Sequence, residues 1–464
     1  MSALQTALSL SRAAGEPSIE ARPPSRPILP VLLGVLTAVS VGVGVGLGYE
    51  QYVLVGVLAV ALGLLSFLVQ RGLLYVLVLV PFGESLGLGS MTVGRLMAVL
   101  CVVVLLARFL TGRLPVPAFR PVTWLPAAAY VLLVVASGLW ATDHGGWLFA
   151  IGQVLLALAF FAAFALLIDH PRQVGGLLRV YVVGALLAAG VGFLQSLTDA
   201  RAVGLQGDAN IYALYQVAAL PAALALARTT TGARRACWLV VTVPILASVL
   251  FSQSRGALLA LVATATFLAL LDRRRRLLVP LVAGVGLLAT VVVPLLDDRY
   301  SVERVSADRA SGRIDIWYTA WHAFLEQPWT GIGAGNYVPQ SIERLTTEPG
   351  VELIKSHLLT GQGIEVHNIY LEALAERGVF GLLTLAVLLV CTLGCLLVVA
   401  HRTRSLLVQA LAPMLVAYCV ASFFLSVSNS KLLWMLVGLA AALLVHVQTP
   451  SPASRPEPVV RSIR

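Results

Sequence analysis

The chain has 464 residues, of which 59% are hydrophobic and only 12% are charged, and its mean hydropathy is +0.90. A soluble domain carries about 25% charged residues, so this chain has too few charges to cover a water-facing surface. The composition predicts a polytopic membrane protein and excludes cytosolic enzymes, secreted disulfide scaffolds and chains that are disordered throughout. The net charge of +10 does not indicate nucleic-acid binding, because a DNA-binding protein concentrates its positive charge on one water-exposed domain.

Apolar runs recur along the whole chain. A membrane-spanning helix needs about 20 mostly apolar residues, and the sequence contains about fourteen candidate runs. These runs lie at 29–48, 52–69, 73–86, 93–110, 124–140, 146–168, 175–197, 211–227, 236–251, 256–271, 277–296, 379–400, 406–425 and 432–446. The third run is short and contains Pro81 and Gly83, so twelve or thirteen spans stay open. We expect an all-α, polytopic transmembrane bundle of twelve to fourteen spans.

The runs divide the chain into five predicted parts. Residues 1–28 are expected to form a cytoplasmic disordered tail, 29–296 spans 1 to 11, 297–366 a long extracytoplasmic loop, 367–447 spans 12 to 14, and 448–464 a second cytoplasmic tail. No small-residue cleavage site follows an apolar core near the N-terminus, so the first run is interpreted as an uncleaved anchor.

Charged residues predict the orientation of the bundle. When the N-terminus is placed inside, every short inner loop is basic, and most Asp and Glu residues fall outside. The four consecutive arginines Arg273 to Arg276 form the most basic of these inner loops. By the positive-inside rule, both termini are predicted in the cytoplasm and the loop 297–366 on the outer face of the cytoplasmic membrane.

The long outer loop contains a helical pattern. Ile314, Trp317, Trp321 and Phe324 recur at spacings of three and four residues, which predicts an amphipathic helix lying along the outer membrane surface. The glycine-rich run 331–335 follows and is interpreted as a turn. It is not a nucleotide fingerprint, because no strand precedes it and no helix clearly follows it.

Three outer arginines are candidates for anion binding. Arg255 lies between two long apolar runs with almost no loop, and an arginine at membrane depth costs about 2.5 to 3.5 kcal/mol on insertion scales. It therefore needs either an anionic partner or a snorkelling route to water, and position alone does not separate these alternatives. Arg313 opens the amphipathic segment, where a solvated helix flank is the competing interpretation, and Arg95 lies at the outer end of the fourth run.

His367 lies at the predicted outer mouth of the twelfth span. An imidazole can act as a general base near neutral pH, but a histidine at a helix start also serves as a cap or a hydrogen-bonded filler, and both interpretations stay open. Tyr370 shares a helix face with His367. Glu376 follows Glu372 by one turn, where either a carboxylate pair or ordinary helix stabilisation is expected.

The outer arginines and the histidine suit a diphosphate-bearing lipid. Arginine pairs bidentately with phosphate and needs neither a proton change nor a metal for this. The remaining histidines show no ligand spacing, and all five cysteines lie in apolar runs, so neither a metal nor a cofactor is predicted. A site of this kind would hold a leaving diphosphate while His367 deprotonates an attacking hydroxyl.

Together these motifs resemble the bacterial O-antigen ligase and O-antigen polymerase superfamily. The resemblance covers roughly residues 124–445, and the order of its short motifs makes it specific. The motifs are Gly207-Asp208-Ala209-Asn210, Ser252-Gln253-Ser254-Arg255-Gly256, Gly312-Arg313 with Trp317, the segment 331–337, and His367-Asn368 leading through Leu371 and Glu376 to Gly378.

The resemblance implies a membrane glycosyltransferase that moves a saccharide from undecaprenyl diphosphate to a glycan, lipid or protein acceptor outside the cytoplasmic membrane. It implies that Arg255 and Arg313 contact the donor diphosphate and that His367 is the base or orients the acceptor. Asn210 matches a family asparagine whose usual preceding proline is here Ala209. Further substrate contacts are expected from the following residues: Arg95, Asn210, Trp317, Tyr370 and Glu376.

Two alternatives stay open on the sequence. About fourteen spans also permit a multispan transporter or flippase for lipid-linked saccharides, although such proteins show internal repeats and midplane polar sites and no repeat is visible here. Ligase and polymerase differ in the acceptor, which the sequence does not identify.

Overall fold

The computed structural model describes residues 70–83, 87–88, 91–112, 120–198, 201–271, 312–351 and 363–448, all within the compact unit Leu65–Arg464. These residues are almost entirely helical, apart from connections and an antiparallel pair of two-residue strands, β1 (Gly87–Leu88) and β2 (Met91–Thr92). The predicted tail 1–28, the predicted tail 448–464 except Gln448, and the predicted spans at 29–48, 52–69 and 277–296 lie outside the described residues.

Helices occupy the remaining predicted spans. In chain order they are α4 (Gln70–Leu79) with the 3-10 helix η1 (Val80–Gly83), α5 (Val93–Leu110), α6 (Pro121–Ala136) with η2 (Ser137–Leu139), α7 (His144–Leu167), η3 (Pro171–Gln173) with α8 (Val174–Ser196), α9 (Ala209–Arg228), α10 (Gly232–Phe251), α11 (Arg255–Leu271), α16 (Ile369–Thr403), α17 (Leu406–Gln409), α18 (Leu411–Ala421) with η7 (Ser422–Phe424), and α19 (Lys431–Gln448). Within the described residues, seven helical segments are long and apolar enough to cross a membrane. The all-α membrane bundle is thus confirmed, and the total of twelve to fourteen spans stays a prediction.

Helix α9 forms the interior of the described bundle. It packs against α8, α10, α11 and α18, and 83% of its 18-residue apolar stretch is buried. Its sequence is rich in alanine, and small side chains let helix backbones approach closely where lipid supplies no hydrophobic drive. In α10 only 17% of the corresponding apolar stretch is buried. Leu239, Val240 and Val243 are exposed, as expected of a helix facing lipid.

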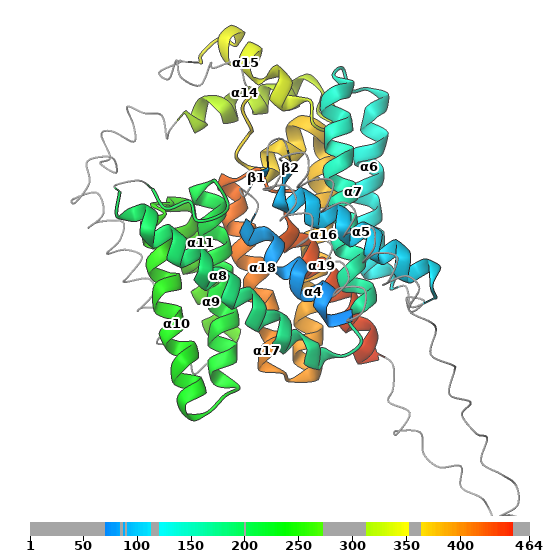
Figure 1. Cartoon of the computed structure of the whole chain (residues 1–464). Helices are drawn as coiled ribbons and strands as arrows, with labels where there is room; N and C mark the ends of the chain where they lie inside the picture. Colours follow the sequence, from blue (N-terminus) through cyan, green and yellow to red (C-terminus); the bar gives the residue numbers. More distant parts are fainter. Residues whose placement is uncertain are drawn as a thin grey trace, which may run out of the picture. The chain divides into compact units, whose positions relative to one another are not determined.

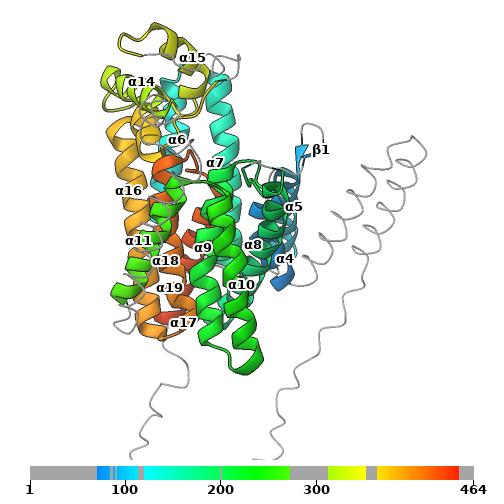
Figure 2. The same ribbon diagram turned by 90° about the vertical axis from the view of Figure 1, so that its left-hand side faces the viewer.

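The polar segment 312–351 gathers at one end of the bundle. It forms α14 (Arg313–Glu326) and α15 (Tyr337–Thr347), which lie over the ends of α6, α7 and α16 in both views (Figures 1 and 2). The predicted amphipathic helix is thus α14. The connections 252–254 and 425–430 also belong to this end, whereas residues 168–170 and His446 meet at the opposite end through the His446 ring and the Ile168 carbonyl, 3.0 Å apart.

A break at Gly378 lets α16 begin under α14. Gly378 has φ +62°, and a Cβ there would meet the Trp329 carbonyl at 2.3 Å. The next amide, Val379 N, donates to the Pro328 carbonyl oxygen at 2.8 Å instead of continuing the helix ladder. Sequence hydropathy predicts the twelfth span at 379–400, while the helix itself starts ten residues earlier, because the first turns of α16 pack against the loop segment and not against lipid.

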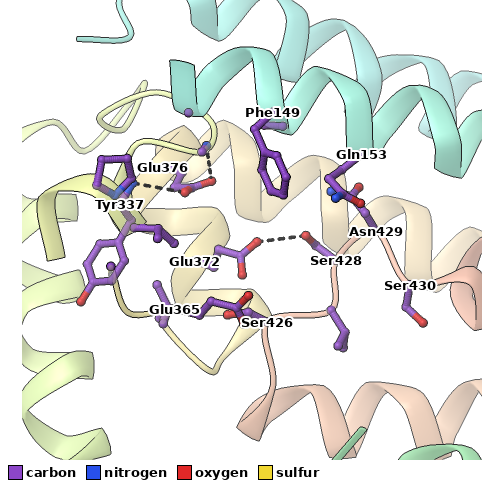
Figure 3. A pocket seen from close by; sticks show the side chains of 18 of the residues that line it. Phe149, Gln153, Tyr337, Glu365, Glu372, Glu376, Ser426, Ser428, Asn429 and Ser430 are labelled. Atoms are coloured by element: carbon purple, nitrogen blue, oxygen red, sulfur yellow. Dashed lines mark hydrogen bonds between the residues drawn. The ribbon is translucent and has the colours of Figure 1, made fainter. Parts of the chain in front are cut away.

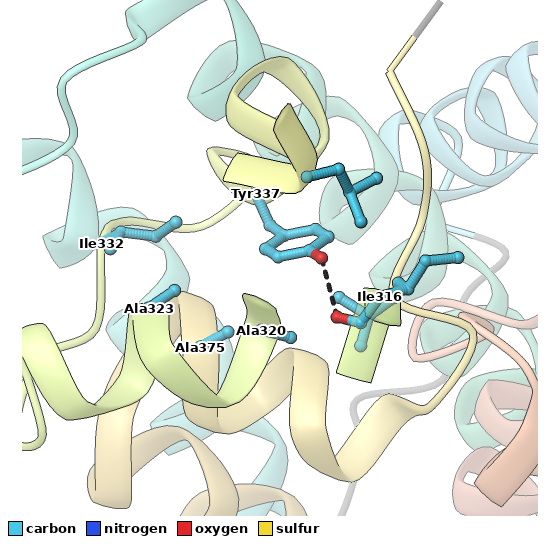
Figure 4. Packing of buried hydrophobic residues seen from close by; sticks show 8 residues of the cluster. Ile316, Ala320, Ala323, Ile332, Tyr337 and Ala375 are labelled. Atoms are coloured by element: carbon cyan, nitrogen blue, oxygen red, sulfur yellow. Dashed lines mark hydrogen bonds between the residues drawn. The ribbon is translucent and has the colours of Figure 1, made fainter. Parts of the chain in front are cut away.

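Buried apolar residues fix α14 and α15 on α16. The cluster consists of Ile316, Ala320, Ala323, Ile332, Tyr337, Leu345, Val366 and Ala375 (Figure 4). The Tyr337 hydroxyl lies at its centre and donates to the Ile316 carbonyl oxygen at 2.9 Å. The segment 312–351 is therefore a packed part of the fold, and this packing holds the start of α14 near the start of α16.

Candidate functional site

The Asn210 and Arg255 motifs are joined by a side-chain hydrogen bond. Asp208 is the N-cap of α9 and accepts from the Asn210 and Ile211 amides at 2.8 and 2.9 Å. The Ser254 hydroxyl donates to Asn210 Oδ1 at 2.8 Å. Asn210 therefore positions the turn before α11. Arg255 is the first residue of α11, and its side chain is exposed.

Arg201 fixes the same turn from the other side. Its Nε donates to the Ser252 carbonyl oxygen at 3.1 Å, and the neighbouring Ala202 amide donates to the Phe251 carbonyl oxygen at 3.1 Å. Gln253 in this turn has φ +52°, a conformation that a non-glycine residue adopts only when its surroundings determine it. The loop 201–208 and the turn 252–254 thus form one rigid corner.

Arg313 lies over an aromatic seat formed by Trp317, Phe423 and Phe424. The Arg313 guanidinium carbon lies 5.9 Å from the centre of the Phe424 ring, within the range of cation–π attraction. The Trp317 ring lies edge-on to Phe423 at 5.7 Å and donates its Nε1–H to the Val366 carbonyl oxygen at 3.1 Å. Trp317 therefore connects α14 to the residue before His367.

His367 adopts a left-handed backbone conformation with φ +54°. Its amide donates to the Ser426 hydroxyl at 2.9 Å. The helix cap is the next residue, Asn368, whose Oδ1 accepts from the Tyr370 and Leu371 amides at 3.0 and 3.1 Å. The capping interpretation of His367 is therefore wrong, because the cap falls one residue later and leaves the imidazole outside the helix.

The predicted cations Arg255 and Arg313 interact electrostatically with Arg201, which the sequence analysis did not single out, and Arg313 interacts with His367. We call these four residues the cationic cluster. Burial lowers the pKa of Arg313; Asp208 opposes this, and the charges of Arg255 and Arg201 add to it. Burial lowers the pKa of His367 below its usual 6.5, Arg313 lowers it further, and Asp208 acts in the opposite direction. Because the imidazole is thereby neutral at neutral pH, it can accept a proton.

A cavity of about 680 Å³ is lined by Glu365, two residues before His367, and by Ser426, whose hydroxyl accepts from the His367 amide (Figure 3). Its walls come from the start of α7, α9, the segments 335–339 and 363–366, α16 and the turn 426–431. Glu372 projects into it and accepts from the Ser428 hydroxyl at 2.9 Å. Burial by the surrounding walls, together with the negative charges of Glu372 and Asp208, raises the pKa of Glu365 to about 7.

Glu376 docks the glycine-rich loop onto α16. Its two carboxylate oxygens accept from the Gly335 and Tyr337 amides at 2.9 and 3.3 Å (Figure 3). At Gly331 and Gly335, which have φ +65° and +72°, a Cβ would meet backbone atoms at 2.3 and 2.2 Å. The expected turn is therefore a tightly packed connection, and Glu376 positions it by accepting these two backbone hydrogen bonds.

The two remaining predicted contacts are Tyr370, whose ring lies 6.1 Å from that of Phe423, and Arg95. The Tyr370 hydroxyl donates to the Cys419 carbonyl oxygen of α18 at 2.8 Å, which engages it in helix packing. Arg95 is in the first turn of α5, and its side chain lies outside the described part of the chain. The structure therefore brings together Arg255, Arg313, Trp317, His367 and, through Ser254, Asn210.

Sequence reasoning missed the polar turn Ser426-Val427-Ser428-Asn429-Ser430-Lys431, which holds the His367 amide and lines the cavity. Its signal was a dense run of polar residues between two apolar runs. It also missed the buried Arg377, whose guanidinium carbon lies 4.9 Å from the centre of the Tyr130 ring. Among the described residues, no group of three or more His, Cys, Asp or Glu side chains has metal-binding geometry.

The family described as O-antigen ligase matches residues 240–386, which confirms the resemblance carried by the motifs. The matched segment contains Arg255, Arg313 and His367, whereas Asn210 and the turn 426–431 lie outside it. Members of this family are enzymes of the ligase and glycosyltransferase type. A comparison with curated proteins finds no match.

Proposed function

We propose that the protein transfers a saccharide from an undecaprenyl-diphosphate-linked donor to an acceptor hydroxyl on the outer face of the cytoplasmic membrane. The observation that carries this proposal is the cationic cluster, in which residues from the α8–α9 loop, α11, α14 and the residue before the α16 cap meet. Arg255 and Arg313 are the two cations of this cluster that lie within the segment matched by the O-antigen ligase family.

The donor diphosphate is assigned to Arg255 and Arg313. Guanidinium groups bind phosphate oxygens bidentately and stay charged at any physiological pH. Burial is the main cause of the lowered pKa of Arg313, and the like charge of Arg255 adds to it. An anion between the two guanidinium groups relieves that repulsion. The N-terminus of α11 adds a favourable dipole for the same anion.

His367 is assigned to proton transfer. In this step the imidazole takes the proton of the acceptor hydroxyl, and the acceptor oxygen forms a bond to the anomeric carbon of the donor sugar. The bond from that carbon to the diphosphate breaks, and undecaprenyl diphosphate leaves with the bonding electron pair, held by the arginines. The neutral state of His367 at neutral pH supports this role.

The outer-face location is supported by the distribution of arginines. Arg172, Arg234, Arg402 and Arg404 lie in or beside the short connections between helices at the opposite end, where the positive-inside rule places the cytoplasm. The α14–α15 end then faces the extracytoplasmic side, where a flipped lipid-linked saccharide is accessible.

Donor binding tests the assignment of the arginines. Full-length protein in nanodiscs is titrated with undecaprenyl diphosphate, and Arg255→Gln and Arg313→Gln are compared with Arg172→Gln, an exposed arginine at the opposite end. Removing a charge-assisted bond costs roughly 1.5–3 kcal/mol, so each cluster variant should bind about 10- to 150-fold more weakly while Arg172→Gln binds normally. Unchanged binding by both cluster variants would refute the donor site.

A further inference from the structure

The cavity beside the cationic cluster has the opposite charge. Glu365, Glu372, Glu376 and Asp143 contribute to its walls, and among the described lining residues Lys431 is the one with a positive charge. The carboxylates of Glu365 and Glu372 are close enough for the charge of Glu372 to raise the pKa of Glu365. A phosphate or carboxylate entering this space would meet repulsion, so the cavity is unsuited to the donor diphosphate.

The same walls suit hydroxyl groups. An ionised carboxylate such as that of Glu372 accepts hydrogen bonds from ligand O–H groups, and Glu365, with a pKa of about 7, can also donate one when it is protonated. The backbone and side chains of the turn 426–431 add further polar atoms around Ser428 and Asn429. Phe149 supplies aromatic surface on the α7 side (Figure 3). A volume of about 680 Å³ lies within the 300–1,000 Å³ that is usual for small-ligand sites.

The cavity is contiguous with the predicted base. Glu365 and Val366 line it and directly precede His367 in the chain. Ser426, another lining residue, holds the His367 amide at 2.9 Å. A ligand in the cavity therefore lies next to the backbone segment that carries His367, and none of the arginines of the cationic cluster lines this space.

We infer that this cavity is the acceptor subsite and that it selects a saccharide carrying no negative charge, with Glu365 and Glu372 accepting hydrogen bonds from its hydroxyl or amino groups. The inference rests on the proposed function and adds to it the chemical class of the acceptor. Two subsites of opposite charge keep donor and acceptor apart: the diphosphate is held by arginines, and the uncharged or amine-bearing acceptor is held by carboxylates.

Saturation-transfer NMR on the full-length protein tests this charge selection. The probes are maltotriose, cellotriose and the N-acetylglucosamine trimer, each compared with its 6-phosphorylated counterpart. At least one neutral probe should bind, with its phosphorylated counterpart at least tenfold weaker. In Glu365→Gln/Glu372→Gln the difference between the two forms should shrink to less than threefold, because two of the four wall carboxylates lose their charge and the amides still hydrogen-bond. Glu343→Gln, which removes an exposed carboxylate of α15 outside the cavity, should keep the wild-type ratio.

Several outcomes overturn the inference. They are equal binding of phosphorylated and neutral probes, binding of none of the neutral probes, and a double variant that keeps wild-type selectivity while folded. If the double variant does not fold, Ser428→Ala replaces it and should weaken neutral-probe binding at least threefold. Donor binding is measured separately with undecaprenyl diphosphate. If the protein binds the donor but none of the saccharides, only the acceptor assignment is refuted. If it binds saccharides charge-selectively but not the donor, the proposed transfer reaction is refuted.

Discussion

The Ser254 hydroxyl donates a 2.8 Å hydrogen bond to Asn210 Oδ1 and thereby joins the start of α9 to the start of α11. The bond connects residues 44 positions apart and fixes the turn that carries Arg255. Asn210, which the family resemblance suggests as a substrate contact, thus uses its side-chain oxygen in a hydrogen bond that stabilises the fold.

A double-mutant cycle on Asn210→Ala and Ser254→Ala measures this connection. Each single variant loses the same bond, so the double variant should be little worse than either, with a coupling of about 0.5–1.5 kcal/mol. The readouts are thermal unfolding and binding of undecaprenyl diphosphate. Additive effects on both would show that the two side chains act independently and that Asn210 has another role.

The charge of Asp208 is predicted to contribute to the pKa of His367, in opposition to burial and Arg313. Asp208→Asn keeps an N-cap residue of equal quality but removes the charge that raises the pKa of His367. The pKa of His367 should fall further, so the acidic limb of the rate profile should move to lower pH. Arg313→Gln should move the His367 pKa in the opposite direction, because a positive charge that lowers it is lost.

The His367 pKa itself is best followed by NMR of a labelled imidazole in the two variants, since this readout does not need turnover. A shift of the same sign in both variants, or no shift in either, would contradict the electrostatic coupling described here.

The glycines of the loop 331–335 are predicted to be needed for full stability of the fold. In Gly331→Ala the new Cβ would meet the Arg377 amide nitrogen at 2.3 Å at a backbone φ of +65°, and strain of this kind costs on the order of 1–3 kcal/mol. The variant should unfold at lower temperature and lose donor binding. The matched control is Gly152→Ala in α7, where no atom lies within 4 Å of the new Cβ; it should be neutral or stabilising by up to about 1 kcal/mol. Equal unfolding temperatures for the two variants would contradict the packed loop.

The sequence predicts features whose residues are neighbours in the chain, and it does not predict contacts between distant segments. Apolar runs and the spacing of Ile314, Trp317 and Trp321 are local, and they correctly predict the membrane bundle and α14. The partners of the predicted residues are tertiary: Phe424 under Arg313 and Gly335 on Glu376 come from distant segments, and no spacing in the sequence joins them. The sequence therefore identifies Arg255, Arg313 and His367 of the cationic cluster. It identifies neither Arg201, nor the scaffold that positions these residues, nor the cavity beside them.

His367→Asn tests proton transfer by His367 most specifically. Asparagine tolerates the left-handed conformation at this position, and the substitution removes the imidazole. A His367→Gln variant serves as a second control, since it keeps a side chain of similar length but tolerates this backbone conformation less well.

The most direct test is transfer by purified wild-type and His367→Asn protein in vesicles containing an undecaprenyl-diphosphate-linked saccharide and acceptor-bearing membrane extract. Removal of a general base costs about 10²- to 10⁴-fold in rate, so His367→Asn should bind the donor normally and transfer its saccharide at least a hundredfold more slowly. Transfer at the wild-type rate by His367→Asn would contradict the account.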